Sequence, residues 1–469
     1  MLFTELAFLP FFAICFALRW TLRPALARKA WLLGCSYFFY GFWDWRFLGL
    51  IFLSTAVGYL SGLALEKEER IRARKLYLTV SLASILAVLG FFKYYNFFVI
   101  SGSSLLGWLG ITVAPRTLEI VLPVGISFFT FQTLSYTFDV YRRRLQPIHS
   151  FLDFAVYVSF FPQLVAGPIV RAATFLPQLR LQQRFAEVDV RRFLLLILAG
   201  YFKKACLADS IAIGIDPVFA APAKYGSLDL AIASAGYSAQ IYCDFSGYTD
   251  MAIGFAGLLG YELCKNFDFP YFSRNVREFW RRWHISLSTW LRDYLYISLG
   301  GGRAGRLTVH RNVIITMLLG GLWHGAAMTF VLWGFLHGLA LIVHREWSER
   351  TRNHTLSLPA GEALGVILTF AWIAICFTIF RSSDITAAWE FLSRMATGQE
   401  GVRTLHSGWG ALLLLLAGWH WFNYRYRTAL VRSARAVPRP IFALSFGACA
   451  AVALFFTPMN PMPFIYFQF

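Results

Sequence analysis

Long apolar segments recur along almost the whole chain, and short connections rich in arginine and lysine separate them. Many of these segments approach the ~20 residues that a helix needs to cross the hydrocarbon core of a bilayer. The pattern predicts an all-α polytopic integral membrane protein, with a single domain over 1–469 and roughly 11–13 transmembrane helices. The apolar segments from which these crossings are drawn are 6–18, 31–40, 47–65, 76–92, 95–112, 119–138, 151–170, 193–215, 228–242, 249–263, 313–343, 361–380, 407–423 and 440–456.

One stretch is too long for a simple span. Between Arg311 and Arg345 lie 33 residues without any Asp, Glu, Lys or Arg. As one straight helix they would extend over about 50 Å, which exceeds the ~30 Å hydrocarbon core. We therefore expect this stretch to tilt, break or re-enter, with a cavity near His324 that satisfies the irregular backbone. The glycines that supply the break points are Gly320, Gly321 and Gly325.

A second unusual stretch, 273–294, combines aromatic and basic residues with helical spacing. Its aromatic face holds Trp280, Trp283, His284, Leu287, Leu291 and Tyr294. Its basic face holds Arg274, Arg277, Arg281 and Arg292. Such a pattern is typical of an amphipathic helix at a membrane surface. We predict one interfacial or re-entrant helix here.

The composition excludes a soluble globular enzyme. Only 14% of the residues are charged, against roughly 25% in soluble domains, and 58% are hydrophobic. The net charge of +18 indicates membrane topology, because basic residues gather in cytoplasmic loops, and it does not require nucleic acid. The seven cysteines are scattered and odd in number, so they suggest neither a disulfide framework nor a metal cluster.

The basic residues also predict where the chain ends lie. The first span is followed by Arg19, Arg23, Arg28 and Lys29, and we interpret it as an uncleaved span rather than a signal peptide. The last span is preceded by Arg425, Arg427, Arg432, Arg435 and Arg439, with no acidic residue among them. Because such loops remain in the cytoplasm, we expect both termini on the opposite, periplasmic side.

His324 is the strongest candidate for chemistry, because an ionisable residue inside an uncharged apolar segment is costly without a cavity or a partner. A histidine titrates near neutral pH and can take a proton from a hydroxyl. The alternative is a structural histidine that is hydrogen-bonded between helices. His284 is the weaker candidate, since a histidine among tryptophans is commonly an amphipathic anchor.

Two interpretations are open for each of the charged residues near these histidines. Arg281 and Arg282 can attract an anionic donor such as a coenzyme A phosphate, although arginines beside a span more often set topology or contact lipid. Asp244 and Asp250 lie in a run of 40 residues without a basic side chain. They fit a surface loop with Gly247 as its turn residue, which we favour, or carboxylates in the cavity.

Motifs of several other enzyme classes are missing or misleading. Residues 300–305 spell G-x-G-x-x-G, but no βαβ unit surrounds them, so we predict no dinucleotide site. The sequence has no nucleophile elbow, Walker A loop or H-E-x-x-H pair, which removes the main support for a serine hydrolase, a nucleotide-driven pump and a zincin. His310 and His324 can share a helix face, but no carboxylate joins them, so we predict no metal site.

Three phrases of the sequence resemble those of a known family. They are FFPQLVAGPIVR at 160–171, FWRRWHISLSTWLRDY at 279–294 and LWHG at 322–325. The chain resembles the membrane-bound O-acyltransferase superfamily and, within it, the bacterial alginate-type polysaccharide O-acetyltransferases. The resemblance extends over most of the chain, including PFIYF at 463–467.

This resemblance implies a site and a donor. It makes His324 the catalytic histidine and His284 the second histidine of the site, in a helical bundle around a funnel or tunnel. The implied donor is acetyl-CoA or another acyl thioester, with no tightly bound cofactor. We add Arg281, Arg282 and Trp323 as donor-binding candidates, and Asp244 and Asn266 as possible polar groups of the pocket.

The resemblance also implies partners and a location. We expect a multi-pass protein of the bacterial inner (cytoplasmic) membrane that contacts lipid and a cytoplasmic acyl donor. On the other side, we expect a periplasmic acetyltransferase or exopolysaccharide assembly proteins as partners. The predicted activity is transfer of an acetyl group to hydroxyls of an extracytoplasmic, alginate-like polysaccharide, directly or through such a partner.

Two alternatives stay open. The phrase NFDFPY at 266–271 also looks like the D-alanyl-transferring branch, so D-alanine from a carrier protein is the second candidate cargo. The other alternative is a secondary transporter or flippase in which His324 and Asp244 relay protons. Transporters usually show paired repeats, and the sequence shows none.

Overall fold

The computed structural model describes the chain except residues 166, 304, 352–358, 406, 459–461 and 468–469. All regular structure in the described residues is helical, apart from one isolated bridge between Tyr225 and Val402. The all-α prediction is therefore confirmed. The chain divides into two compact units, Met1–Phe193 with Ala252–Cys264, and Leu194–Met251 with Lys265–Phe469. A single domain over 1–469 stays a prediction.

Phenylalanines from distant segments form the core at the start of the first unit. The ring of Phe8 lies 6.1 Å from Phe39, 6.4 Å from Phe161 and 4.7 Å from Phe255, all measured between centroids. The helices of this unit are α1 (Phe8–Thr21), α2 (Ala25–Asp44), η1 (Trp45–Phe47), α3 (Leu48–Lys67), α4 (Ile71–Leu89), η2 (Gly90–Tyr94), α5 (Tyr95–Trp108), α6 (Ile126–Tyr141), α7 (Phe151–Ser159), α8 (Phe161–Leu164), α9 (Ala172–Arg180) and η3 (Phe185–Glu187).

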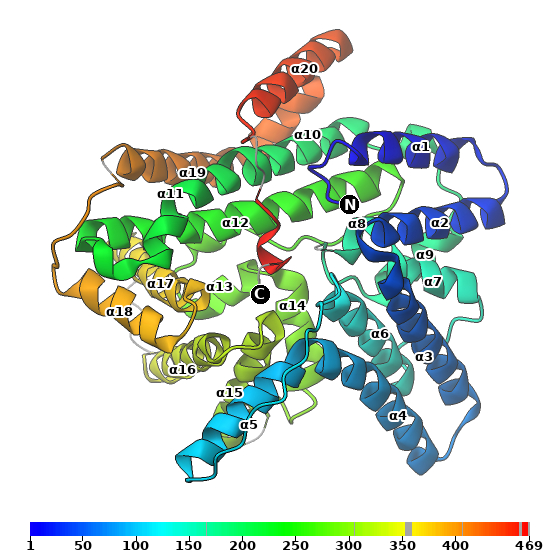
Figure 1. Cartoon of the computed structure of the whole chain (residues 1–469). Helices are drawn as coiled ribbons and strands as arrows, with labels where there is room; N and C mark the ends of the chain where they lie inside the picture. Colours follow the sequence, from blue (N-terminus) through cyan, green and yellow to red (C-terminus); the bar gives the residue numbers. More distant parts are fainter. Residues whose placement is uncertain (166, 304, 352–358, 406, 459–461, 468–469) are drawn as a thin grey trace. The chain divides into compact units, whose positions relative to one another are not determined.

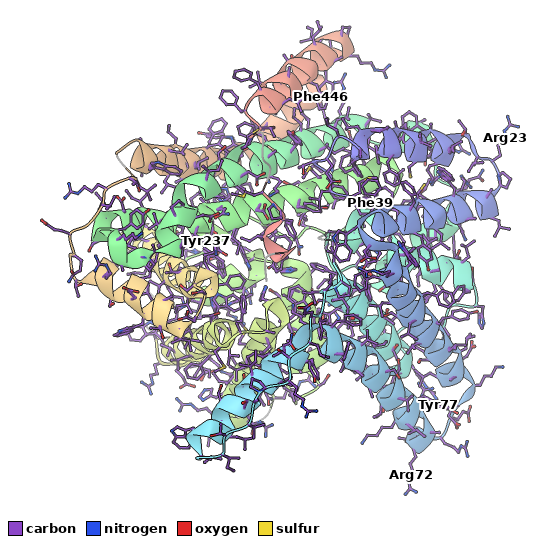
Figure 2. All side chains as sticks on the ribbon, in the orientation of Figure 1. Arg23, Phe39, Arg72, Tyr77, Tyr237 and Phe446 are labelled. Carbon is purple, nitrogen blue, oxygen red and sulfur yellow. The ribbon has the colours of Figure 1, made fainter. Side chains whose placement is uncertain are left out.

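Basic side chains mark two ends of this first unit. Figure 2 shows Arg23 projecting from the connection between α1 and α2, and Arg72 projecting from the first turn of α4. Both side chains are exposed. Arg23 belongs to the basic connection from which the side of the N-terminus is predicted.

The second unit contains all the predicted site residues. Its helices, labelled in Figure 1 where there is room, are α10 (Val190–Tyr201), η4 (Phe202–Ala208), α11 (Asp209–Ala220), η5 (Pro222–Lys224), α12 (Ser227–Leu258), η6 (Pro270–Phe272), α13 (Val276–Arg282), α14 (Ile285–Trp290), η7 (Leu291–Tyr296), α15 (Arg306–His324), α16 (Met328–Arg350), α17 (Pro359–Arg381), α18 (Ile385–Ala396), α19 (Ser407–Ala436), α20 (Arg439–Phe455) and η8 (Ile465–Phe467). The division between the units falls within α10 and α12.

Several helices are long and apolar enough to cross a membrane. Among the described residues, the helical runs that meet this criterion are Ala25–Lys67, Ile71–Trp108, Met328–Arg350 and Gly361–Arg381. The pair Thr428–Ala436 and Arg439–Phe455, bent by 119°, adds a fifth if it is counted as one span. Other predicted spans are broken or shortened: α6 begins only at Ile126, and the π-helical turns of η4 interrupt 193–215. The number of 11–13 crossings stays a prediction.

The long uncharged stretch breaks as predicted, and of the three predicted glycines Gly325 lies at the break. α15 ends at His324, Gly325–Ala327 are extended or irregular, and α16 begins at Met328. Gly321 lies inside α15 and is not a break point. A Cβ at Gly321 would collide with the carbonyl oxygen of Phe330 on α16, so this glycine permits the close packing of the two helices.

The loop predicted around Asp244 and Asp250 is wrong. The predicted spans 228–242 and 249–263 are joined in one helix, α12, which runs through both aspartates. Gly247 is not a turn residue, because it lies inside α12. A Cβ there would lie 2.6 Å from the carbonyl oxygen of Gly200 on α10. The absence of a side chain at Gly247 lets α10 and η4 approach α12. Figure 2 labels Tyr237, a buried residue of α12.

Candidate active site

The segment 273–294 is not the single helix that its periodicity predicts. It breaks between α13 and α14 at His284, which has a left-handed backbone with a φ of 41°. Such a conformation is rare for a residue with a Cβ and persists where surrounding contacts hold it. Here the backbone of 265–269 supplies them: Ile285 N–H donates to Asn266 O at 2.9 Å, and Asp268 N–H donates to Arg282 O at 3.0 Å.

His284 is fully buried and held by one polar side chain. Its Nδ1 lies 3.2 Å from Oδ1 of Asn266, an oxygen that also accepts from the backbone N–H of Ser286 at 3.1 Å. Because this oxygen can only accept, Nδ1 carries the proton and Nε2 presents a lone pair. Burial lowers the pKa of His284 to about 3, so the ring is neutral at neutral pH. Within the described part of the chain, Nε2 has no hydrogen-bond partner.

His324 is the last residue of α15 and is 4% exposed. Aromatic rings from three other elements surround it. Their centroids lie 5.1 Å away for Trp333 on α16, 5.3 Å for Phe380 on α17 and 5.5 Å for Tyr466 in η8. The imidazole therefore sits in an apolar, aromatic environment, as the uncharged stretch around it predicts.

Trp323 bridges the two histidines. Its ring centroid lies 5.7 Å from that of His284 and 5.1 Å from that of His324. The ring of Phe245 on α12 also contacts this group, with its centroid 4.7 Å from that of His284 and 4.8 Å from that of Tyr466. The structure thus brings both predicted histidines into one cluster. The predicted donor-binding residue Trp323 lies between them.

The two candidate donor arginines have different surroundings. Arg282 pairs with Glu278 at 2.6 Å, and its guanidinium lies 5.6 Å from the ring centroid of Tyr424. Arg281 is exposed and forms no ion pair with any described residue. Arg281 is therefore the one of the two with a charge available to a ligand.

The two predicted polar groups of the pocket have different roles in the structure. Asn266 contacts the site directly through His284. Asp244 is buried and pairs with Lys204 at 2.6 Å, so its carboxylate is engaged by a cation from η4. Lys204 was not predicted as the partner of Asp244. Its signal was available, since Lys203 and Lys204 are the basic residues inside the predicted span 193–215.

Tyr466 and His337 are among the residues of the cluster that were not predicted. The Nε1–H of Trp280 donates to Nδ1 of His337 at 3.3 Å. The ring of His337 lies 4.6 Å from Trp333, which in turn contacts His324. His337 lies in the same uncharged stretch as His324. An ionisable residue inside an apolar segment is costly, and this reason for choosing His324 applies equally to His337.

Metal ligands do not gather in the described residues. No group of three His, Cys, Asp or Glu side chains among them could hold an ion. The cluster offers instead imidazoles inside aromatic walls. Such groups can accept a proton from a hydroxyl where little water competes.

Comparison with known proteins agrees with this chemistry. The chain matches the membrane-bound O-acyltransferase (MBOAT) family over residues 126–383, which include both histidines. It is 40% identical to a probable alginate O-acetylase AlgI of Azotobacter vinelandii over 400 residues, which cover 84% of this chain and 78% of that protein. It is 37% identical to a peptidoglycan O-acetyltransferase of Helicobacter pylori over 427 residues, 85% of this chain and 80% of that protein.

A more distant relative carries a different name. A teichoic acid D-alanyltransferase of Streptococcus thermophilus is 27% identical over 287 residues, which cover 55% of this chain and 68% of that protein. The family match and the identities over most of the chain lead to one conclusion. The chain belongs to the membrane-bound O-acyltransferase family and is a membrane-integral O-acyltransferase.

Proposed function

We propose that the protein transfers an acetyl group from a cytoplasmic acyl thioester, acetyl-CoA, to hydroxyls of an extracytoplasmic polysaccharide, directly or through a periplasmic partner. The observation that carries this proposal is the cluster in which Trp323 joins His284 to His324. The names of the alginate and peptidoglycan acetylating relatives support acetyl as the cargo and a polysaccharide as the acceptor.

His324 acts as the general base in this proposal. Its imidazole takes the proton of the acceptor hydroxyl while the hydroxyl oxygen attacks the carbonyl carbon of the thioester. The new C–O bond forms, the C–S bond breaks, and the departing thiolate receives the proton from the imidazolium. The aromatic walls of Trp333, Phe380 and Tyr466 keep competing water away from the thioester.

His284 positions the acceptor. Because Asn266 accepts from Nδ1–H, Nε2 can accept a hydrogen bond from a second hydroxyl of the acceptor, beside the one whose proton His324 takes, and it cannot donate one to an oxyanion. This geometry favours orientation of the acceptor over stabilisation of developing negative charge. The left-handed backbone of His284 fixes the direction of its ring.

The donor approaches from the cytoplasm in this proposal. Arg281 is the exposed cation that would meet phosphates of the donor, while Arg282 is engaged by Glu278. The protein would reside in a bacterial inner membrane with both termini in the periplasm, and partners there would complete the transfer. A tunnel through the second unit is part of this proposal.

D-alanyl transfer is the competing cargo. The relative named for it has a lower identity, 27%, and its match covers 55% of this chain. The acetylating relatives match 84% and 85% of the chain at 40% and 37% identity. We therefore favour acetyl.

The test uses the full-length protein purified in detergent with acetyl-CoA that carries a labelled acetyl group. The acceptors are alginate oligomers and peptidoglycan fragments in parallel, with and without a periplasmic acetyltransferase. We expect label to reach a polysaccharide, and His324→Ala to abolish it. Consumption of D-alanyl carrier protein without consumption of acetyl-CoA would favour the competing cargo. Turnover in detergent, where no compartment exists, would exclude a transporter.

A further inference from the structure

Lys204, Asp209 and Asp244 form a buried cluster of charged side chains close to the histidines. Asp244 precedes Phe245 on α12, and the ring of Phe245 contacts His284. Nζ of Lys204 is 2.7 Å from Oδ1 of Asp209 and 2.6 Å from Oδ1 of Asp244, and these three side chains are 2–4% exposed. Buried ion pairs contribute little net stability, because desolvation offsets their attraction. Stability alone is therefore a weak reason for this cluster.

Two members of the cluster also hold a distant part of the chain. Nζ of Lys204 donates to the carbonyl oxygen of Met462 at 3.0 Å. Oδ2 of Asp244 accepts from the backbone N–H of Ile465 at 2.9 Å. Both contacts are to the backbone, and together they fix the segment 462–466 at two points, as Figure 1 illustrates for η8 beside α12.

This fixed segment forms one wall of the histidine cluster. The ring of Phe464 lies 4.8 Å from Tyr248 and 5.8 Å from Phe245, both on α12. The next aromatic residue, Tyr466, lies 5.5 Å from His324 and 6.1 Å from Trp323. The position of Tyr466 at the catalytic histidine therefore depends on the backbone contacts one to four residues earlier.

We propose that Lys204 and Asp244 are positioning residues that latch the segment 462–466 against His324, and that the latched segment excludes water from the acyl thioester. This inference rests on the proposed function, because the excluded reaction is hydrolysis of the same donor. In that reaction a water oxygen attacks the carbonyl carbon, the C–S bond breaks, and acetate and a free thiol form. One proton of the water passes to the thiolate and the other is released from the acid.

The purely structural alternative makes a different prediction. If the cluster only stabilises the fold, its loss lowers hydrolysis and acyl transfer together. If it latches the segment, its loss raises hydrolysis relative to transfer, because His324 stays in place while the wall opens. The ratio of acetate released to acetyl transferred separates the two roles.

The chain offers a matched control at the adjacent position. Lys203 lies on the same element as Lys204 and pairs with Asp250 on the same helix, α12, and it also donates to Ser246. Among the described residues, none of its hydrogen bonds or ion pairs reaches 462–466. Lys203→Met removes a buried lysine of the same kind without releasing the segment.

The first experiment compares Lys204→Met with Lys203→Met, using acetyl-CoA and the polysaccharide acceptor. We expect the ratio of hydrolysis to transfer to rise roughly tenfold or more in Lys204→Met and to stay at the wild-type value in Lys203→Met. Lys204→Met leaves two buried carboxylates without their cation, so a second variant is needed. Ile465→Pro removes the backbone N–H that donates a hydrogen bond to Asp244, and it keeps the ion cluster. It should raise the same ratio.

The second experiment needs no activity. Ile465→Cys places a thiol on the segment at a position that is 2% exposed. Its labelling by N-ethylmaleimide is followed by peptide mass mapping, which separates it from the exposed Cys264 and Cys449. We expect protection in the wild-type and Lys203→Met backgrounds, and roughly tenfold faster labelling with Lys204→Met.

The outcomes separate the two proposals. Equal labelling in the Lys203→Met and Lys204→Met backgrounds would overturn the latch, whether or not the protein transfers acetyl groups. An unchanged ratio in both Lys204→Met and Ile465→Pro would overturn its role in excluding water. Absence of acetyl transfer by the wild-type protein would instead count against the proposed function, and the labelling result would still decide the latch.

Discussion

Oδ1 of Asn266 lies 3.2 Å from Nδ1 of His284 and also accepts from the backbone N–H and the hydroxyl of Ser286, at 3.1 and 2.8 Å. One amide oxygen therefore fixes both the backbone break and the ring of the second histidine. This arrangement determines which imidazole nitrogen carries the proton. The catalytic proposal depends on that assignment.

Asn266→Asp should move the acid limb of the pH–rate profile. In the wild-type protein, burial holds the pKa of His284 at about 3, so this ring stays neutral at all pH values used for assay. A carboxylate beside it favours the imidazolium and raises the pKa of His284. If transfer needs a neutral His284 ring, the rate should fall at a higher pH in Asn266→Asp than in the wild type as the pH is lowered.

The measurement is the rate of acetyl transfer between pH 5 and 9 for the wild type and Asn266→Asp. Asn266→Leu serves as the control, because it removes the hydrogen bond without adding a charge. It should lower the rate at every pH without moving the acid limb. An identical profile in the wild type and Asn266→Asp would contradict the role given to this pair.

His324→Ala should remove nearly all acetyl transfer, because loss of a positioned general base costs about 10² to 10⁴ in rate. His284→Ala should be less severe, since His284 orients the acceptor and takes no proton. If the two histidines act as one unit, the double variant should be scarcely slower than His324→Ala. Initial rates with labelled acetyl-CoA check this, with protein yield and size-exclusion behaviour as controls. A folded His324→Ala protein with near-normal transfer would contradict the assignment.

Much of this architecture could be predicted from the sequence. The length of the uncharged stretch requires a break, and the break follows His324 directly. The break at His284 was not predictable, because the helical spacing of aromatic residues continues through it. It is Asn266 and its neighbours, from an earlier segment, that hold the left-handed backbone. Local periodicity contains no information about such a contact.

The charged cluster shows the same limit. Asp244 has no cation within its own stretch of sequence, and this absence suggested a surface loop. In the folded chain Lys204 reaches it from η4, and the carboxylate becomes compatible with a buried helix. Tyr466 likewise joins the site only through tertiary contacts. Burial cost predicted that Asp244 needs a partner, but not where the partner is.

Arg281→Gln should raise the KM for the acyl thioester more than it lowers kcat. A phosphate contact is present in the ground state and the transition state alike, so its loss weakens binding uniformly. Arg282→Gln is the matched control, because its guanidinium already pairs with Glu278. Steady-state kinetics with varied acetyl-CoA check both. Equal effects of the two substitutions, or a loss of kcat alone with Arg281→Gln, would be inconsistent with a donor role for Arg281.

Both chain ends should lie in the periplasm. The exposed Arg23 lies in the connection between α1 and α2, and the exposed Arg72 lies in the first turn of α4; positive charges should retain both segments in the cytoplasm. Alkaline phosphatase, which is active only in the periplasm, should be active when fused after Phe469. Green fluorescent protein, which fluoresces only in the cytoplasm, should be dark at the same position. The reverse result would overturn the C-terminal orientation, and a fusion within the connection that holds Glu68 and Arg70 is the cytoplasmic control.

Gly321→Ala should destabilise the protein and displace His324. A Cβ at Gly321 would collide with the backbone carbonyl oxygen of Phe330, which cannot move without shifting α16. Overpacking of this kind typically costs about 1–3 kcal/mol. Gly320→Ala is the matched control, because its Cβ would meet only the end of the Leu291 side chain at 3.1 Å. A side chain end can rotate away, whereas a backbone carbonyl in a helix cannot.

The two glycine variants are compared by thermal unfolding in detergent and by acetyl transfer at a temperature where both are folded. Gly321→Ala should show the lower Tm, and its rate should fall even when folded, because His324 is three residues further along the same helix. Gly320→Ala should keep most of its activity. Equal Tm values and equal rates would show that the close approach of α15 and α16 at Gly321 does not position the catalytic histidine.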